Sequence, residues 1–335
     1  MPRQNNTEAL LQIENLELTF ASDFGERSYL NDVSFELYPG EILGVVGESG
    51  SGKSITALAI MQLLAKNGRV TKGKILFKGQ DLVPLSSKEM DAFRGQHISI
   101  VFQDAMTSLN PVFTIGNQLR EAVRSHRRMS RREADSECLR LLELVGLSGA
   151  GRIMRSYPHT LSGGMRQRVM IAMAMAADPE ILIADEPTTA LDVTVQAQIM
   201  ALLKQLAKER GTAIMLISHD IGLIAQMADR VLVMYAGQLV ETSPLRELFE
   251  NPCHPYTMAL MRSVPSITDD PDRELQSIPG VVAPNYSEIS GCRFYSRCEF
   301  ATELCQEPQP VIQLGEQHYS RCHLAETFNI RHKSE

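Results

Sequence analysis

Apolar and polar residues alternate in two segments near the start of the chain. Every second residue is apolar between positions 16 and 20 and again between 33 and 37, which is the period of half-buried strands. Short, largely apolar runs are typical of strands buried on both faces, and they occur at 42–46, 98–102, 181–184, 213–217 and 231–235. The pattern therefore predicts a sheet made mostly of buried strands.

Helical spacing lies between some of these strands. Val195, Ile199, Leu202 and Leu206 are four, three and four residues apart, so they lie on one face of a helix. Because strand, helix and strand follow one another, the sheet is predicted to be parallel and covered by helices. The predicted fold class is α/β.

A mostly helical segment, about residues 86–177, interrupts this order. Ser86 with Glu89 and Ser130 with Glu133 form S-x-x-E capping boxes, which mark two helix starts. The segment also carries a basic island, which fits either a solvated helix face or a specific anionic partner. Its members are Arg120, Arg124, Arg127, Arg128, Arg131 and Arg132.

Composition narrows the class of protein. The chain has 335 residues, 44% of them apolar and 22% charged, which excludes a disordered or fibrous protein. Its 33 basic and 40 acidic side chains give a net charge of −7, which argues against a surface built to hold nucleic acid. The longest apolar run, residues 169–177, is far shorter than the about 20 residues of a membrane span. Glu8, Glu14 and Glu17 interrupt any signal peptide, so we expect a cytosolic protein.

A phosphate-binding motif follows the run at 42–46. Residues 47–54 read GESGSGKS, which fits G-x-x-x-x-G-K-[ST] between a predicted strand and a helical segment at 55–65. Such a loop turns backbone N–H groups toward phosphates, while Lys53 neutralises phosphate oxygens and Ser54 offers a hydroxyl to Mg²⁺. The residues expected to bind ATP here are Gly47, Glu48, Ser49, Gly50, Ser51, Gly52, Lys53, Ser54 and Ile55.

Two carboxylates end a later predicted strand. Asp185 and Glu186 follow the run at 181–184. In P-loop enzymes an acid at this place holds Mg²⁺, which we assign to Asp185, and Glu186 is then the general base that activates water. The alternative is that the two acids only cap the next helix, and this interpretation is less favoured in a chain that also contains a P-loop.

Four further motifs occur along the chain. They are Gln103 in VFQD at 101–104, the glycine-rich LSGGMRQR at 161–168, ALD at 190–192 and His219 in ISHD at 217–220. Together with the P-loop and Asp185-Glu186, these motifs resemble those of ABC-type ATPases in order and spacing, over about residues 11–241.

The resemblance implies a head-to-tail dimer with ATP between two nucleotide-binding domains. Residues of the LSGGMRQR segment, which resembles the family's signature motif, and of the ALD motif would face the partner's ATP, namely Ser162, Gly163, Gly164 and Asp192. His219 would hydrogen-bond the γ-phosphate and orient the attacking water, and Gln103 would link the Mg²⁺ site to the helical insertion. Phe20 occupies the place of the aromatic residue that stacks on adenine, with Tyr29 as the alternative.

One branch of the family matches nearly the whole chain: the ATPase subunits of bacterial dipeptide and oligopeptide importers. The matching segments include SLNP at 108–111, ADEPTTALDV at 184–193 and NPCHPYT at 251–257. The resemblance implies a nucleotide-binding domain over residues 1–245 and a C-terminal oligopeptide-transporter domain over 246–335. Seven prolines between 244 and 284 fit this change of composition.

Four cysteines gather near the end of the chain. Cys292, Cys298, Cys305 and Cys322 have five, six and sixteen residues between them, and a cytosolic location disfavours disulfides. Spacing alone leaves zinc, an iron–sulfur cluster and unliganded thiols open. The family resemblance implies a 4Fe-4S cluster, whose charge Arg293, Arg297 and Arg321 would partly offset. Cys138 and Cys253 are expected to be a packed thiol and a loop residue.

The resemblance also implies partners and a place in the cell. We expect a paralogous ATPase subunit, two transmembrane permease subunits and an extracytoplasmic peptide-binding protein, with no nucleic acid. The chain would then lie on the cytoplasmic face of the bacterial inner membrane. Alternatives are an importer ATPase for an antimicrobial peptide or a nickel or other metal chelate, a soluble ABC ATPase of iron–sulfur assembly, and one that acts on DNA ends or ribosomes. One P-loop and no heptad repeats fit the last alternative poorly.

Overall fold

The computed structural model describes residues 8–23, 25–103, 108–263, 278–283 and 285–333, with side chains up to residue 329. Asp104 of the glutamine motif and the prolines at 265, 271 and 284 lie outside the described residues. The chain divides into two compact units. The first comprises residues 1–10, 37–42 and 84–217, and the second comprises 11–36, 43–83 and 218–335.

The first unit contains three parallel strands. β7 (Ile181–Asp185) lies between β6 (Ile98–Val101) and β8 (Ala213–Ser218), with Ile181 opposite Ile98 on one side and Ala213 on the other. Every residue of β7 and β8 is buried, as the apolar runs predict. α8 (Val193–Arg210) connects β7 to β8 and buries Ile199, Leu202 and Leu206.

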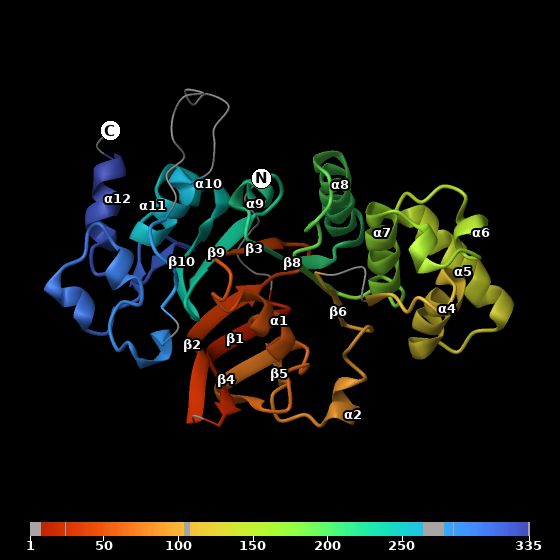
Figure 1. Ribbon diagram of the computed structural model, residues 1–335, viewed down its shortest axis with the longest axis horizontal. Coiled ribbons are helices and arrows are strands. Elements are labelled where there is room, and N and C mark those ends of the chain that lie inside the picture. The colour runs from red at the N-terminus through yellow and green to blue at the C-terminus, as the bar shows by residue number, and fades with distance from the viewer. Residues whose placement is uncertain (1–7, 24, 104–107, 264–277, 284, 334–335) are drawn as a thin grey trace. The chain divides into compact units, whose positions relative to one another are not determined.

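The predicted helical segment of the first unit contains several helices in its described part, and α4, α5, α6 and α7 lie beside one another in Figure 1. Both predicted capping boxes are confirmed, because Ser86 and Ser130 each exchange two hydrogen bonds with the glutamate three residues later. Two arginines of the basic island form ion pairs, Arg120 with Asp135 and Arg127 with Asp178, as on a solvated helix face. The helices are α2 (Ser87–Met90), α4 (Ile115–His126), α5 (Arg131–Leu144), α6 (Ala150–Ile153) and α7 (Gly163–Ala174).

The second unit contains an antiparallel sheet in the order β2-β1-β4-β5. Leu11 of β1 lies opposite Phe77 of β4, and the alternating apolar residues of β1 and β2 are mostly buried. The bounds are β1 (Leu11–Ser22), β2 (Gly25–Leu37), β4 (Gly68–Phe77) and β5 (Gln80–Asp81).

A second group of strands in this unit has the order β11-β12-β10-β9-β3. β3 is parallel to β9, whereas β9, β10, β12 and β11 pair antiparallel. The last two strands belong to the C-terminal part of the chain, residues 246–335, which we call the tail. The sequence analysis predicted no strand there. The bounds are β3 (Ile42–Val46), β9 (Arg230–Tyr235), β10 (Gln238–Pro244), β11 (Ile312–Gln313) and β12 (Tyr319–Ser320).

The helix after the P-loop is shorter than predicted. α1 spans Lys53–Ile60 instead of reaching residue 65. Gln62 has φ of +48°, a left-handed conformation that is incompatible with a right-handed helix. Its side-chain amide donates to the carbonyl oxygen of Leu82. Other helices of this unit are α9 (Ile221–Ala225), α10 (Leu245–Glu250), α11 (Pro255–Arg262) and α12 (Ala325–Lys333).

The tail forms a small apolar cluster. Met258 of α11 and Phe328 of α12 are buried there together with Cys253, Cys322 and Ala325, and Phe300 packs against them. Short 3₁₀ turns carry much of the remaining chain, at Tyr286–Glu288, Tyr295–Arg297 and Glu303–Gln306.

Candidate functional site

The P-loop connects β3 to α1 in the second unit. A Cβ atom on Gly47 would lie 2.1 Å from the carbonyl oxygen of Met234, so only glycine fits there. Lys53 is 5% exposed, and its Nζ donates to the carbonyl oxygens of Gly47 at 2.7 Å and Glu48 at 3.0 Å. The lysine therefore lies folded against its own loop.

The first turn of α1 is arranged to receive an anion. Gly52 precedes the helix with φ of +105° and supplies no side-chain cap. The first backbone N–H groups of the helix, including those of Ser54 and Ile55, lie at the positive end of the helix dipole, which favours phosphate there. Ser51 is fully buried within the loop.

Both candidate adenine-stacking residues lie on neighbouring strands. Phe20 on β1 and Tyr29 on β2 have ring centroids 4.9 Å apart in an edge-on arrangement. A Cβ atom on Gly68 would lie 2.5 Å from the Phe20 ring, so glycine gives this ring its space. The structure thus brings the two alternatives together as one aromatic pair.

The strand carboxylates lie in the first unit with the glutamine. Asp185 ends β7 and is 7% exposed. Glu186 follows with φ of +46°, and its Oε2 accepts from Gln103 Nε2 at 2.8 Å and from Thr189 Oγ1 at 2.9 Å. A non-glycine residue in this conformation is strained and must be held by its surroundings. Gln103 and Glu186 are therefore joined directly, which the sequence did not predict.

The signature motif begins α7. Ser162 caps this helix by accepting from the N–H of Met165, and a Cβ atom on Gly164 would lie 2.4 Å from Val195 of α8. Asp192 caps α8 by accepting from the N–H of Val195 at 3.0 Å. The signature glycines and the ALD motif are thus packed together at two neighbouring helix N-termini.

His219 belongs to the second unit and follows the end of β8. It is exposed, and the next residue, Asp220, caps α9 by accepting from the N–H groups of Gly222 and Leu223. The histidine therefore lies at the strand end where the sequence placed it.

All six cysteines are free thiols. Cys138 and Cys253 are both buried, the first within α5 and the second in the apolar cluster of the tail. Burial raises the pKa of Cys138 to about 12, so it is an inert packed thiol.

The four tail cysteines are close enough to affect one another. The pKa of Cys292 is raised to about 11 and that of Cys322 to about 12, chiefly by burial and in smaller part by the other tail thiols. The N–H of Cys292 donates to the carbonyl oxygen of Cys305 at 2.7 Å. Among the described residues, however, no three of these sulfur atoms lie within 4.8 Å of one another.

The three arginines beside these cysteines have partners other than a cysteine. Arg297 contacts Glu48 of the P-loop with two N–H···O bonds, of 2.6 and 2.9 Å, and Arg293 donates to the carbonyl oxygen of Ala236. Arg321 lies 2.9 Å from a carboxylate oxygen of Asp32. Each arginine therefore has a protein partner, and the expectation that the three charges partly offset a cluster stays a prediction.

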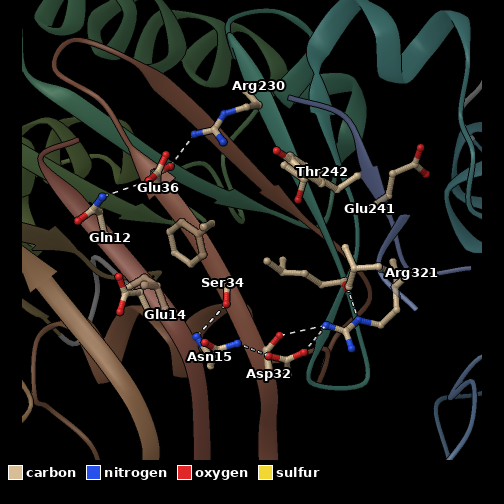
Figure 2. A pocket seen from close by; sticks show the side chains of 16 residues that line it. Gln12, Glu14, Asn15, Asp32, Ser34, Glu36, Arg230, Glu241, Thr242 and Arg321 are labelled. Carbon is tan, nitrogen blue, oxygen red and sulfur yellow. Dashed lines mark hydrogen bonds and ion pairs between the residues drawn. The ribbon is translucent and has the colours of Figure 1, made fainter. Parts of the chain in front are cut away.

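Figure 2 shows the Arg321 contact in a groove of about 520 Å³ between β1, β2, β9, β10 and the tail. Asp32 also accepts from the side chain of Asn15 at 2.8 Å, and Asn15 N–H donates to Ser34. Burial would raise the pKa of Asp32, but the hydrogen bonds from Asn15 and Arg321 lower it overall. The tail is therefore anchored to β2 through a charged hydrogen-bond network.

A P-loop, a strand-end carboxylate pair and a capped glycine-rich helix together define the ATP-binding cassette class of ATPases. Residues 30–189 match the ABC transporter family, and residues 240–305 match the oligopeptide/dipeptide transporter C-terminal region. A putative peptide import ATP-binding protein of Brucella abortus is 49% identical over 94% of this chain and 95% of its own. A probable peptide ABC transporter ATP-binding protein of Sinorhizobium fredii is 49% identical over 93% and 94%.

Solved structures agree. A dimeric bacterial ABC transporter cassette has a TM-score of 0.64 and 30% identity, covering 70% of this chain and 99% of its own. The same cassette in a post-hydrolysis state with ADP and inorganic phosphate matches equally well. The chain therefore belongs to the ATP-binding proteins of ABC transporters, in the branch that carries the oligopeptide/dipeptide transporter C-terminal region. Among the described helices, none combines the length and the apolar character that crossing a membrane requires.

Proposed function

We propose that this chain binds and hydrolyses ATP to power the import of dipeptides or oligopeptides through a membrane permease. The observation that carries the proposal is a complete cassette motif set followed by the oligopeptide/dipeptide C-terminal region, in a chain that matches peptide import proteins over nearly its whole length. Catalysis by the related cassette, found with ADP and phosphate, supports hydrolysis.

The residues divide into binding and chemical roles. The P-loop residues 47–55 hold the phosphates, and Phe20 stacks on the adenine. Glu186 accepts a proton from the attacking water while His219 orients that water against the γ-phosphate. Ser162, Gly163, Gly164 and Asp192 serve the ATP bound by the partner subunit. Gln103 holds the base, because its amide nitrogen donates to Glu186.

The donor set fits Mg²⁺, a hard cation that prefers oxygen ligands. In the proposed site Ser54 would offer a hydroxyl, Asp185 a carboxylate and Gln103 its amide oxygen, since the Gln103 amide nitrogen donates to Glu186. Bound there, the ion would neutralise charge on the β- and γ-phosphates.

The tail thiols also fit a metal group. They are mutually close, free, and offer soft sulfur ligands. A single tetrahedral zinc, with Zn–S of about 2.3 Å, needs sulfurs about 3.8 Å apart. No three of the described sulfurs lie within 4.8 Å of one another, so they do not form a ready zinc site. We propose instead the 4Fe-4S cluster that the family resemblance implies, on Cys292, Cys298, Cys305 and Cys322. Such a cluster would cross-link the tail and supply a redox centre.

Iron analysis tests the cluster. Protein purified without oxygen is expected to contain iron and acid-labile sulfide in equal amounts, and a variant with all four cysteines changed to alanine should contain neither. A well-folded wild-type protein with no iron would exclude the cluster. A Cys138→Ala variant is the matched control because that thiol lies in the helical insertion.

The proposed domains are residues 1–245 for nucleotide binding, with a helical insertion at about 86–177, and 246–335 for the C-terminal domain. The proposed partners are a paralogous ATPase subunit, two permease subunits and an extracytoplasmic peptide-binding protein. Together they would place the chain at the cytoplasmic face of the bacterial inner membrane.

Reconstitution tests this function. The chain, co-purified with the permease proteins encoded beside it and placed in liposomes, is expected to hydrolyse ATP faster when peptide and binding protein are present. A Lys53→Ala variant should abolish hydrolysis and transport together. If peptides of any length leave ATP turnover unchanged while a metal chelate stimulates it, the peptide cargo is wrong and the ATPase assignment stands.

A further inference from the structure

Glu48 of the P-loop is held at all its polar groups. Its N–H donates to the Tyr256 hydroxyl at 2.9 Å, and its carbonyl oxygen accepts from Lys53 Nζ at 3.0 Å. Its two carboxylate oxygens accept hydrogen bonds from the two terminal nitrogens of Arg297, at 2.6 and 2.9 Å. Two of these partners, Tyr256 and Arg297, come from the tail, more than 200 positions along the chain from Glu48.

Arg297 is built into its place. Its side chain is 5% exposed, its Nε donates to the carbonyl oxygen of Pro279 at 2.7 Å, and its guanidinium lies against the rings of Tyr235 and Phe294. A buried guanidinium with a two-point contact to a carboxylate fixes both distance and orientation, which a lysine would not do. The ion pair therefore behaves as a rigid link between the tail and the P-loop.

The Arg297 end of this link lies next to the tail cysteines in the sequence. Arg297 ends a short turn, Tyr295–Arg297, that lies between Cys292 and Cys298. The turn is fastened to Cys292, whose carbonyl oxygen accepts from the N–H of Tyr295 at 3.0 Å. Any change in the arrangement of these cysteines would therefore move the guanidinium that holds Glu48.

Electrostatics gives the link a role in nucleotide binding. A carboxylate on the P-loop would repel the phosphates of ATP unless its charge is compensated. Arg297 compensates it without using the phosphate-binding N–H groups, and it fixes the residue whose carbonyl oxygen binds Lys53. We infer that Arg297 is a positioning residue for the P-loop, through which the cysteine-rich tail sets the affinity of the nucleotide site.

A charge-compensation experiment tests this inference. The full chain, purified with its partners, is titrated with a fluorescent ATP analogue in four forms: wild type, Arg297→Ala, Glu48→Gln and the double variant. We expect Arg297→Ala to weaken binding by at least about fivefold, the low end of typical coupling between sites. Glu48→Gln removes the charge that needs compensation, so adding Arg297→Ala to it should cost little further affinity, and the double variant should recover most of the loss.

Recovery separates positioning from general support of the fold. Loss of a merely structural contact would not be reversed by a second change on the P-loop. Equal affinities for wild type and Arg297→Ala, or a double variant as weak as Arg297→Ala, would overturn the inference. If Arg297→Ala does not fold, Arg297→Lys keeps the charge without the two-point contact and should give an intermediate loss that Glu48→Gln reverses. Arg262→Ala, which removes an exposed ion pair with Glu299 in the same tail, is the control.

The connection to the cysteines rests on the cluster proposed above and has its own readout. Cys298→Ser is expected to lower the iron content and to weaken ATP binding as much as Arg297→Ala, with no further loss when the two are combined. If Cys298→Ser loses iron but keeps its ATP affinity, the tail does not act through the cluster. If the wild type binds no iron, the cluster is wrong, while the Arg297 and Glu48 variants still decide the role of the link.

Discussion

The carboxylate of Glu186 is held in one orientation by two donors. Gln103 and Thr189 both donate to the same oxygen, Oε2, and the backbone of Glu186 is in a left-handed conformation. A group fixed in this way loses little freedom when it takes a proton from water, which is what a general base requires. Gln103 and Glu186, the proposed base, are thus held together by a direct hydrogen bond.

Replacing Glu186 with glutamine tests its role as base. The amide has the same size and its oxygen still accepts from Gln103, so the fold and ATP binding should persist. Hydrolysis should fall by about 10²- to 10⁴-fold, the usual contribution of a general base. Phosphate release and ATP retention on the purified complex measure the two effects. Hydrolysis within tenfold of wild type would assign the base to another residue.

Gly164 is required by close packing. An added Cβ would lie 2.4 Å from Val195, so Gly164→Ala should push α7 away from α8 and cost about 1–3 kcal/mol of unfolding free energy. Gly151 has nothing within 4 Å of its added Cβ, so Gly151→Ala should leave stability unchanged or raise it slightly. Urea unfolding of both variants checks the difference. Equal stabilities would mean that α7 can shift without cost.

At the scale of elements, the sequence predicted the strands and helix starts well because both depend on local pattern. The apolar runs became buried strands, and both capping boxes formed. The end of α1 was missed because it depends on the Gln62 contact with Leu82, which lies 20 residues away. The tail strands β11 and β12 are two residues each, too short for any period to appear.

The same reasoning explains which site residues could be predicted. The P-loop and signature residues lie within short motifs whose spacing is set by the requirements of phosphate binding, so they can be found in the sequence alone. Arg297 and Arg321 carry no such signal, because their partners Glu48 and Asp32 lie 249 and 289 positions away. Their position beside cysteines suggested an interaction with a cluster instead of the ion pairs that the structure contains.

A buried histidine joins the tail to β10 and α10. His318 is fully buried, with Nε2 2.8 Å from Glu241 on β10 and Nδ1 3.1 Å from Glu247 on α10. Glu241 also accepts from the N–H groups of Cys253 and His254. Burial would lower the pKa of His318, but the hydrogen bonds and charges of Glu241 and Glu247 raise it overall.

This arrangement predicts a pH dependence. Because the folded-state pKa of His318 exceeds its unfolded value of about 6.5, its stabilisation is complete below that pH and is lost as pH rises through the folded pKa. His318→Gln should lower stability by about 1.5–3 kcal/mol at pH 6 and by less in alkaline buffer. Urea unfolding between pH 6 and 9 measures this, with the exposed His159→Gln as control. A constant difference between wild type and His318→Gln would mean that His318 does not titrate in this range.

At the scale of the whole molecule, the family resemblance implies a dimer in which the signature motif of one chain faces the ATP bound by the other chain. Ser162 and Gly163 present the N-terminus of α7, a 12-residue helix with no acidic residue in its first turn. A helix end of this kind favours a phosphate, and in a head-to-tail pair that phosphate belongs to the partner's ATP. Association and nucleotide binding should therefore be separable.

Gly163→Asp separates them. An acidic side chain in the first turn stabilises a helix, and the added Cβ meets only the flexible end of Leu191 at 3.2 Å, so the variant should fold. The same charge repels the partner's γ-phosphate. The isolated chain should then bind ATP with normal affinity, whereas ATP-dependent pairing with the second ATPase subunit, measured by light scattering in the Glu186→Gln background, should be lost. Gly151→Asp, at an exposed position of α6 in the insertion, should pair normally. If Gly163→Asp also pairs normally, the signature helix does not contact the partner's nucleotide, and ATP would have to close the dimer through other residues.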